Sequence, residues 1–510
     1  MPHEPTPEQQ KILTAASESS TSLMISAYAG TGKTTTLTML AEALPSAPSL
    51  ALAFNVKIKQ ELERRFPAHF TVKTMNGLGH GAWARFLGRQ PQVDDRKLGS
   101  LISSLSKSLD FPLDTEGWTT VRSLVTVAMQ AGLVPSIFPT KAGFTTDTPA
   151  NWQSLAEDHY LDTSERLRAF ARDVLIASVK LAFGTGTTPT ISFDDQIYLP
   201  TLYGASFPSF ALTLVDEAQD LSLLQHEMVR KVSGKGRLIV VGDPRQAIYG
   251  FRGADTSSME KLRALRPDWI DLPLTLTFRC PQAIVALQQT HAPGFTAAPS
   301  NLPGQIIDLR GKEDGWAWSD LPEGDLAVLC RNNAPLISLA LKLLSKHIPC
   351  IMLGRDIGKG LASLAKKICP EPATPAPICA QKVQDWLEQE AQLAKANGRE
   401  HKLSGLQDRA ECLLAVLEHV PTAGDLQAKL KEIFSRDHGK VTLSSGHRAK
   451  GLEWQTVVHL DPWRLPSKFA LRAAHNGHKV QLEQERNLEY VIETRTKENL
   501  VFANLKELVL

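Results

Sequence analysis

The sequence predicts an α/β protein with two parallel-sheet halves, each interrupted by a mainly helical insertion. Residues 21–44 read as a short apolar strand, a glycine-rich turn and a helix. Apolar runs at 210–220 and 236–246 end in acidic residues, as buried parallel strands do where they form an active-site edge. Short amphipathic helical patterns fill 91–192 and 358–437, between these strand-rich regions.

The remaining strands follow in order along both halves. In the first half, the apolar run 49–55 and the short strand at 71–74 are each followed by a helical pattern. In the second half, strands are expected within 324–333, 440–447 and 454–461. The expected domains are therefore a first α/β domain (1–90 and 193–275), its insertion (91–192), a second α/β domain (276–357 and 438–510) and a shorter insertion (358–437).

Composition sets limits but does not indicate a function. The chain has 510 residues, which exceeds what one hydrophobic core usually organises. Lys and Arg total 56 against 54 Asp and Glu, giving a formal net charge of +2. Charge therefore neither supports nor excludes a polyanionic partner, and any nucleic-acid surface must be a local groove.

Cysteines and apolar runs indicate the compartment. Six cysteines contain no CxxC pair, which argues against a zinc ribbon or an iron–sulfur cluster and favours buried, reduced thiols. The first ten residues show no signal-peptide pattern, and no apolar run approaches the roughly 18 residues of a membrane span. We expect a soluble, cytoplasmic protein without a membrane partner.

Residues 27–34, AYAGTGKT, fit the phosphate-loop pattern [A/G]-x4-G-K-[S/T]. Glycines let backbone N–H groups point at phosphate oxygens, and the start of a helix adds partial positive charge. The alternative, a chance glycine-rich turn, does not explain the flanking strand and helix. The motif predicts ATP and Mg²⁺ as cofactors, with Lys33 reaching the β- and γ-phosphates and Thr34 ligating Mg²⁺. The nucleotide contacts are Ala29, Gly30, Thr31, Gly32, Lys33, Thr34 and Thr35.

The acidic pair Asp216–Glu217 follows a second apolar run. At such a strand end, Asp216 can hold Mg²⁺ and Glu217 can orient or deprotonate the attacking water. Taken alone, the same residues could begin a helix as solvated acids, but the phosphate loop favours the catalytic interpretation. The long separation of Lys33 from Asp216 agrees with a helical insertion between them.

Six further segments carry recognisable motifs: 6–10 (TPEQQ), 193–195 (FDD), 242–254 (GDPRQAIYGFRGA), 277–279 (TFR), 447–454 (HRAKGLEW) and 485–496 (ERNLEYVIETRT). With the phosphate loop and the acidic pair, their order resembles that of the UvrD/Rep-type superfamily 1 DNA helicases. The resemblance covers most of the chain and implies that both α/β domains are RecA-like.

The resemblance implies roles for residues around the nucleotide. Gln9 would contact adenine, Phe278 would stack on it, and Gln246 would sense the γ-phosphate. Arg279 and Arg495 would contact the transferring phosphate, although either arginine alone could be an ordinary ion-pair residue. Phe278 replaces the usual Tyr of its motif, and Glu493 stands where a small or apolar residue is usual. Further nucleotide contacts are implied for Gly451 and Glu453.

The resemblance also implies a path for single-stranded DNA and duplex junctions, with movement in the 3′→5′ direction. Several motif residues depart from the usual pattern: Asn76 stands where a His is common, and Phe251 replaces a Trp. Each aromatic alone could equally belong to a core. The implied DNA contacts are Phe54, Asn55, Thr74, Asn76, Tyr249, Phe251, Arg252 and His447.

Three other functions are compatible with parts of this pattern. The first is a DNA-stimulated translocase that strips or remodels protein–DNA complexes without strong unwinding. The second is a nonhydrolytic scaffold, against which Lys33, Glu217 and Arg495 argue together. The third is a helicase–nuclease, for which the 15 residues after Arg495 leave no room. We expect a monomer acting in repair, recombination or replication; the sequence names no protein partner.

Overall fold

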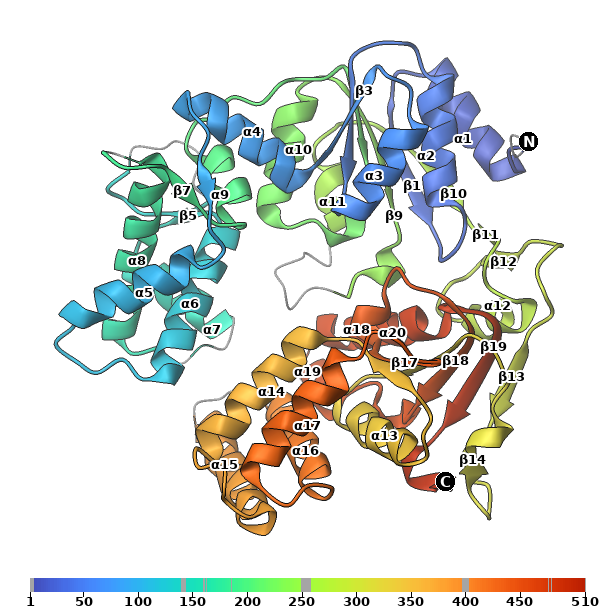
Figure 1. The fold of residues 1–510 in the computed structure, drawn as a ribbon. Helices are drawn as coiled ribbons and strands as arrows, with labels where there is room; N and C mark the ends of the chain where they lie inside the picture. Colours follow the sequence, from blue (N-terminus) through green and yellow to red (C-terminus); the bar gives the residue numbers. More distant parts are fainter. Residues whose placement is uncertain are drawn as a thin grey trace. The chain divides into compact units, whose positions relative to one another are not determined.

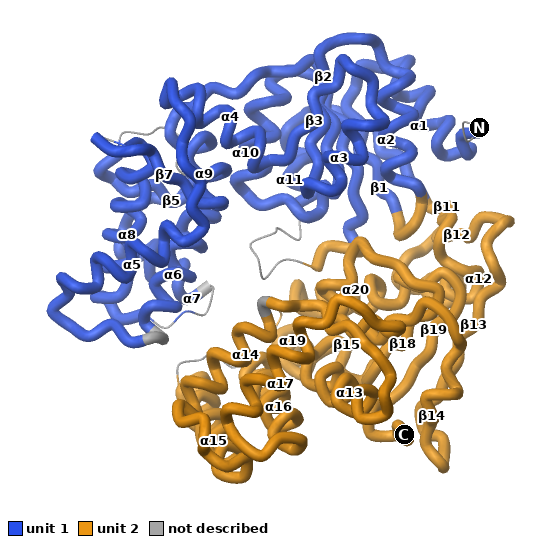
Figure 2. The backbone as a smooth tube through the Cα atoms, viewed as in Figure 1, with its two compact units in different colours: residues 1–27, 32–244, 249–274 blue, residues 28–31, 245–248, 275–510 orange. Residues whose placement is uncertain are grey.

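The computed structural model describes residues 4–138, 144–158, 161, 163–184, 186–248, 258–396, 403–475, 477 and 479–509. The chain divides into two compact units (Figure 2). Unit 1 comprises residues 1–27, 32–244 and 249–274, and unit 2 comprises 28–31, 245–248 and 275–510. Two short segments of the first half are thus grouped with unit 2, and both belong to predicted motifs.

Unit 1 is built on a six-stranded parallel sheet with the strand order β10-β1-β9-β8-β2-β3 (Figure 1). Strand β1 lies between β10 and β9 and aligns Leu23 with Ile239 of β9 and with Ile270 of β10. The strands are β1 (Ser22–Ala27), β2 (Ser49–Ala53), β3 (Phe70–Thr74), β8 (Leu212–Val215), β9 (Arg237–Gly242) and β10 (Trp269–Leu274).

Both faces of this sheet are covered, which explains why its strands are continuously apolar. Leu23 and Ile25 pack into a core with helices on one face, whereas Met24 packs into a second core on the other. The first core receives α1 (Pro7–Glu18), α2 (Lys33–Ala43) and α3 (Val56–Arg65); the second receives α4 (Met75–Leu87), α10 (Leu223–Ser233) and α11 (Ser258–Arg263).

The first insertion forms a helical body with its own core within unit 1 (Figure 1). Phe170 and Val174 lie in that core with Trp83 of α4. A buried ion pair joins Lys97 to Asp195 at 2.6 Å and ties α5 to the start of α9. The helices are α5 (Lys97–Leu105), α6 (Thr115–Gln130), α7 (Pro149–Asp158), α8 (Glu165–Phe183) and α9 (Asp195–Leu202), and the short strands are β4 (Gln92–Val93), β5 (Leu133–Val134), β6 (Thr145–Thr146) and β7 (Thr190–Ile191).

Unit 2 holds a second six-stranded parallel sheet, in the order β13-β19-β18-β15-β17-β16. Together, the two sheets confirm the predicted fold class. The strands are β13 (Gln305–Asp308), β15 (Leu326–Cys330), β16 (Cys350–Met352), β17 (Val441–Ser445), β18 (Trp454–Leu460) and β19 (Thr496–Ala503); short strands are β11 (Leu276–Thr277), β12 (Thr296–Ala297), β14 (Trp316–Ala317) and β20 (Leu508–Val509).

The second helical region shares its core with this sheet. Leu413 and Leu426 of the helices lie in one cluster with Val328 and Leu443 of the strands. This differs from the first insertion, whose core includes residues of α4 and α10 but none from the strands of the six-stranded sheet of unit 1. The exact insertion boundaries stay predictions. The helices of unit 2 are α12 (Gln282–Gln288), α13 (Ala334–Ser345), α14 (Arg355–Ile368), α15 (Ala376–Ala396), α16 (Leu403–Leu417), α17 (Ala423–Ser435), α18 (Gly446–Ala449), α19 (Lys468–His475) and α20 (Val480–Glu493).

The structure also bears on the cysteines and on a possible membrane span. All six cysteines are buried and free of disulfides, as expected of reduced thiols. Burial raises the pKa of the Cys330 thiol to about 12, so this side chain is held as a neutral, unreactive group. Within the described part of the chain, no helix has the length and apolarity needed to cross a membrane.

Candidate functional site

The predicted phosphate loop lies between β1 and α2. Gly30 and Gly32 adopt the left-handed backbone conformation, with φ of 70° and 79°, which side chains other than glycine rarely adopt. Gly32 caps α2, and Thr34 and Thr35 lie in the first turn of that helix. The first N–H groups of a helix have no partner within it, so this turn offers donors and partial positive charge to a phosphate.

Gly30 is also required by close packing within unit 2. A Cβ on Gly30 would lie 2.5 Å from the Cβ of Arg279 and 2.7 Å from the Thr277 hydroxyl. The Gly30 carbonyl accepts a hydrogen bond from the Phe278 N–H at 2.9 Å. The segment 277–279 therefore lies directly against loop residues 28–31, which belong to the same unit.

In unit 1, Lys33 forms an ion pair with the predicted water-activating residue. Its ammonium lies 3.0 Å from both carboxylate oxygens of Glu217. Glu217 also accepts a 2.6 Å hydrogen bond from Gln219, whose other amide atom accepts from the Asp243 N–H. Glu217 itself has a φ of 49°, a left-handed conformation that is uncommon for a non-glycine residue and occurs often at functional sites.

Burial and neighbouring charges raise the pKa values of both Asp216 and Lys33 in this cluster. Burial, then the neighbouring Glu217, raises the pKa of Asp216 to about 7, although Lys33 opposes the shift. Burial alone would lower the pKa of Lys33, but Glu217, Asp216 and Asp243 outweigh it and raise that pKa. Without nucleotide, Lys33 thus neutralises acids that would otherwise repel one another.

Asp216→Asn is expected to stabilise the nucleotide-free protein while removing a predicted Mg²⁺ ligand. The Asp216 pKa is about 7 in the folded protein against an ordinary 3.8, so its ionised form disfavours folding. The wild-type free energy of unfolding should therefore fall as pH rises from about 4 through about 7. At pH 8 the variant should be more stable by about 2–4 kcal/mol, a gain that shrinks toward pH 5.

Urea unfolding at pH 5 and pH 8 measures this difference. Asp325→Asn, at an exposed aspartate, is the control for the loss of one carboxylate. Equal stability of Asp216→Asn and wild type at pH 8 would contradict the electrostatic account of this cluster.

Gln9, the predicted adenine contact, is buried and structurally engaged. It closes a capping box at α1: its side-chain oxygen accepts from the Thr6 N–H at 3.0 Å, and the Thr6 hydroxyl accepts from the Gln9 N–H. Its amide nitrogen donates to the Thr36 hydroxyl on α2 at 3.0 Å. Gln9 therefore links the N-terminal turn to the helix that follows the phosphate loop.

Two further predicted nucleotide residues, Arg279 and Glu453, pair with each other in unit 2. The Arg279 guanidinium lies 2.7 Å from the Glu453 carboxylate, which also pairs with Lys497 at 2.5 Å. Burial would raise the pKa of Glu453, but Lys497 and Arg279 outweigh it and lower that pKa. The Phe278 ring is 50% exposed, as a platform for a stacked base requires. Gly451 has a left-handed φ of 83° at the turn after α18.

Arg495, the predicted arginine finger, is held against the C-terminal end of α20, the helix that precedes it. Its side chain is buried, donating to the Val491 carbonyl at 2.9 Å and to the Thr494 hydroxyl at 3.2 Å. Gln246, also buried, has its backbone carbonyl bound by the Lys450 ammonium at 2.6 Å. These contacts anchor both residues within unit 2.

The predicted DNA contacts divide into exposed and structurally engaged residues. Phe54 is 42% exposed at the carboxyl end of β2. Asn55 caps α3 by accepting from the Ile58 N–H, and Thr74 caps α4 in the same way. Asn76 donates to the Phe193 carbonyl at 2.9 Å. Half-buried His447 lies in α18, whereas Tyr249, Phe251 and Arg252 lie outside the described residues.

Family models match both halves of the chain. Residues 190–266 match the UvrD/REP helicase N-terminal domain, and residues 381–507 match the UvrD-like helicase C-terminal domain. The first match spans the acidic pair and Gln246, and the second spans Glu453 and Arg495. Both halves of the chain are thus similar to the UvrD-like superfamily 1 helicases.

Relatives of this UvrD-like chain are named as DNA helicases. It is 27% identical to the F-box DNA helicase protein 1 of Schizosaccharomyces pombe, over 97% of this chain and 57% of that protein. It is 24% identical to the F-box DNA helicase 1 of Gallus gallus, over 98% of this chain and 49% of that protein. With the ATP-dependent DNA helicase UvrD1 of Mycobacterium leprae it shares 26% identity, over 60% of this chain and 40% of that protein. The chain thus spans about half the length of its first two relatives.

The donor chemistry of the UvrD-like site fits a magnesium nucleotide. In the described residues, no group of three or more His, Cys, Asp or Glu side chains is arranged to hold a metal ion. Mg²⁺ commonly binds through one or two carboxylates together with water and substrate phosphates. The Thr34 hydroxyl and the Asp216 carboxylate supply the hard oxygen donors that such a shared site needs.

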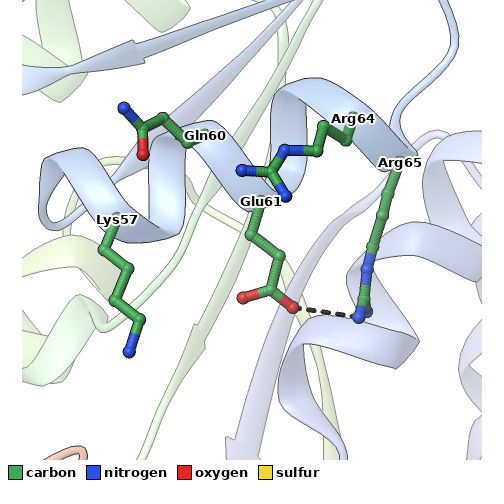
Figure 3. A pocket seen from close by; sticks show the side chains of 5 residues that line it. All are labelled: Lys57, Gln60, Glu61, Arg64 and Arg65. Carbon is green, nitrogen blue, oxygen red and sulfur yellow. Dashed lines mark ion pairs between the residues drawn. The ribbon is translucent and has the colours of Figure 1, made fainter.

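A surface hollow of about 340 Å³ lies on α3, directly after Phe54 and Asn55. Figure 3 shows its lining, which comes from one helix. Glu61 forms an exposed ion pair with Arg65 at 3.1 Å, and the remaining charges are positive. The lining residues are Lys57, Gln60, Glu61, Arg64 and Arg65.

Sequence reasoning missed two buried contacts in unit 2. Tyr490 accepts a hydrogen bond from the Ala29 N–H of the phosphate loop at 3.0 Å. Glu493 accepts from Gln288 at 2.5 Å and lies 3.2 Å from His459. An acidic residue at position 493, where a small or apolar residue is usual, was a signal for the contacts of Glu493. No local pattern indicated the contact between Tyr490 and Ala29.

Proposed function

We propose that the chain is an ATP-dependent DNA helicase or translocase that moves 3′→5′ on single-stranded DNA. The observation that carries this proposal is the phosphate loop with Lys33 paired to Glu217 and with Arg279 packed against Gly30. The similarity of both halves to the UvrD-like helicases and the names of the relatives support it. We further propose that it acts as a monomer in the cytoplasm and binds duplex junctions.

Lys33 and the acidic pair bind and activate the reactants in this proposal. Lys33 exchanges its partner Glu217 for the β- and γ-phosphates of ATP, which frees the Glu217 carboxylate to orient the attacking water and to accept its proton. Thr34 and Asp216 hold Mg²⁺, which neutralises charge on the phosphates when bound. The amides at the start of α2 bind phosphate oxygens, and Gln9 and Phe278 hold the adenine.

Arg279, Arg495 and Gln246 act on the γ-phosphate. Arg279 lies in contact with the loop segment at Gly30, so exchanging Glu453 for phosphate needs only a local movement of its side chain. Arg495 has to leave the Val491 carbonyl to reach the phosphate, so its catalytic contribution depends on a conformational step. Such a step couples hydrolysis to movement along DNA.

Single-stranded DNA binds through stacking and phosphate contacts. Phe54 offers an exposed ring, and the positive charges of α3 follow it directly. Base stacking tolerates any sequence, and the cations neutralise backbone phosphates. The remaining contacts are proposed for Asn55, Thr74, Asn76, Tyr249, Phe251, Arg252 and His447.

Phe54→Ala is expected to weaken the binding of single-stranded DNA by about 1–3 kcal/mol, the contribution of one stacked base. The Kd for a fluorescent oligothymidylate, measured by anisotropy, should therefore rise by roughly fivefold to 150-fold. Phe144→Ala, at a phenylalanine of similar exposure outside the predicted motifs, should leave it unchanged. Equal Kd values for Phe54→Ala and wild type would contradict the proposed contact between Phe54 and single-stranded DNA.

Unwinding of tailed duplexes tests the proposed activity. With ATP and Mg²⁺, the protein should separate a duplex with a 3′ single-stranded tail and leave a 5′-tailed duplex paired. Preferential unwinding from a 5′ tail would contradict the direction. DNA-stimulated hydrolysis with no unwinding of either substrate would indicate a translocase that remodels protein–DNA complexes, and ATP binding without turnover would indicate a scaffold.

A further inference from the structure

The phosphate loop receives a hydrogen-bond acceptor from the far end of the chain. The Tyr490 hydroxyl on α20 accepts the Ala29 N–H at 3.0 Å. Both residues are buried, with Ala29 at 0% and Tyr490 at 1% exposure. A buried backbone N–H without an acceptor is costly, so this hydroxyl satisfies a donor that solvent does not reach.

Tyr28, the residue before Ala29, is fixed by the same part of unit 2. Its hydroxyl donates to the Pro293 carbonyl at 2.8 Å. Its ring meets the edge of Phe295 at a centroid distance of 5.5 Å, and the Arg245 guanidinium lies 4.6 Å from its centroid. Phe295 also packs 6.4 Å from the Tyr490 ring. Tyr28 and Tyr490 are therefore parts of one buried aromatic cluster.

These contacts fix the loop on both sides of its glycine turn. The Ala29 N–H is bound by Tyr490, and the Gly30 carbonyl is bound by the Phe278 N–H. The Tyr28–Ala29 and Gly30–Thr31 peptide groups, on either side of the turn at left-handed Gly30, therefore have defined directions before the chain reaches Gly32 and α2. A loop ordered in advance loses less conformational freedom when it binds a ligand.

The same face of α20 also contacts the segment that contains Gln246. Asn487 lies three residues before Tyr490, a spacing that places both side chains on one helix face. The Asn487 amide donates to the Ala247 carbonyl at 3.2 Å. Helix α20 ends at Glu493 and leads directly into Arg495. One helix thus joins the loop, the Gln246 segment and the predicted arginine finger.

We propose that the Tyr490 hydroxyl is a positioning group that holds the phosphate loop in its nucleotide-binding conformation through the Ala29 N–H. This role rests on the proposed ATP-dependent function and adds a residue that itself touches no nucleotide. Through α20, the position of the loop is linked to that of Arg495.

Tyr490→Phe removes the acceptor and keeps the ring packed. The Kd for ATP with Mg²⁺, measured by calorimetry, should rise by about threefold to tenfold, the effect of one lost hydrogen bond. The KM for ATP in DNA-stimulated hydrolysis should rise by a similar factor, with kcat within about twofold of wild type, because the groups that contact the reacting phosphate are unchanged. Tyr28→Phe, which removes the contact to Pro293, should raise the Kd in the same direction.

Tyr198→Phe is the matched control. Tyr198 is a buried tyrosine of α9 whose hydroxyl donates to the Leu133 carbonyl at 2.6 Å. Its loss should lower the melting temperature without changing the Kd for ATP. An unchanged Kd in folded Tyr490→Phe, or an equal rise in Tyr198→Phe, would overturn the positioning role.

The wild-type measurements separate this inference from the proposed function. If wild type binds ATP but does not hydrolyse it in the presence of DNA, the proposed function fails. The ratio of the ATP Kd of Tyr490→Phe to that of wild type then still tests the role of Tyr490. If wild type binds no ATP, both fail. If hydrolysis proceeds and Tyr490→Phe matches wild type in Kd and KM, the inference alone fails.

Discussion

Lys33→Ala is expected to reduce the kcat for DNA-stimulated ATP hydrolysis by at least about 10²–10³-fold, the effect of removing one group that stabilises transition-state charge. Lys33 lies at the start of α2, where its ammonium can reach the β- and γ-phosphates. It also lowers the pKa of Asp216, so its loss favours protonation of a proposed Mg²⁺ ligand. Movement along DNA should stop with hydrolysis.

Two variants make the Lys33 result specific. Lys235→Ala removes an exposed lysine from the same unit and should retain wild-type turnover. Lys33→Met keeps most of the side-chain volume and should be as inactive as Lys33→Ala. Phosphate release is measured with saturating single-stranded DNA, after circular dichroism shows each variant to be folded. Near-wild-type turnover in folded Lys33→Ala would contradict the proposed role of the phosphate loop in ATP hydrolysis.

Arg495→Ala is expected to bind ATP and to lose hydrolysis, by about 10³–10⁵-fold if the residue acts as an arginine finger. The lost group would stabilise charge that develops on the γ-phosphate only in the transition state, so kcat should fall far more than affinity. The ATP Kd is measured by calorimetry, and the rate of the chemical step by single-turnover hydrolysis.

Burial of Arg495 requires a second variant. Alanine removes hydrogen bonds to the Val491 carbonyl and the Thr494 hydroxyl, so the melting temperature should also fall. Arg495→Lys keeps the positive charge but lacks the planar fork of guanidinium donors, and it should remain folded with hydrolysis strongly reduced. Arg310→Ala, at a surface ion pair with Asp308, controls for the loss of an arginine from unit 2. Weaker ATP binding with an unchanged single-turnover rate would count against the finger role.

The fold followed from sequence where burial produces a local pattern. Leu23, Met24 and Ile25 are continuously apolar because alternate side chains enter cores on opposite faces of the sheet. Helical periodicity predicts an apolar face but does not identify its partner. The sequence therefore did not indicate that Leu413 and Leu426 share a core with the second sheet, whereas the first insertion has its own.

Residues of the candidate site were predicted only where they fall in motifs, and their roles stay predictions. Lys33 and Glu217 were predicted from their places after apolar strands, and their ion pair brings these distant segments together. The bond from Ala29 to Tyr490 joins residues 461 positions apart, and neither residue marks the contact locally. Likewise, Arg495 was expected as a finger, but its packing against Val491 depends on how α20 ends.

We propose that single-stranded DNA drives ATP hydrolysis by this chain. The steady-state rate of phosphate release with ATP and Mg²⁺, measured with and without a long oligothymidylate, tests this coupling. We predict slow turnover alone and at least about tenfold faster turnover with DNA, since closure that completes a catalytic site changes rates by such factors. Equal rates with and without DNA, or no hydrolysis in either case, would contradict the claim.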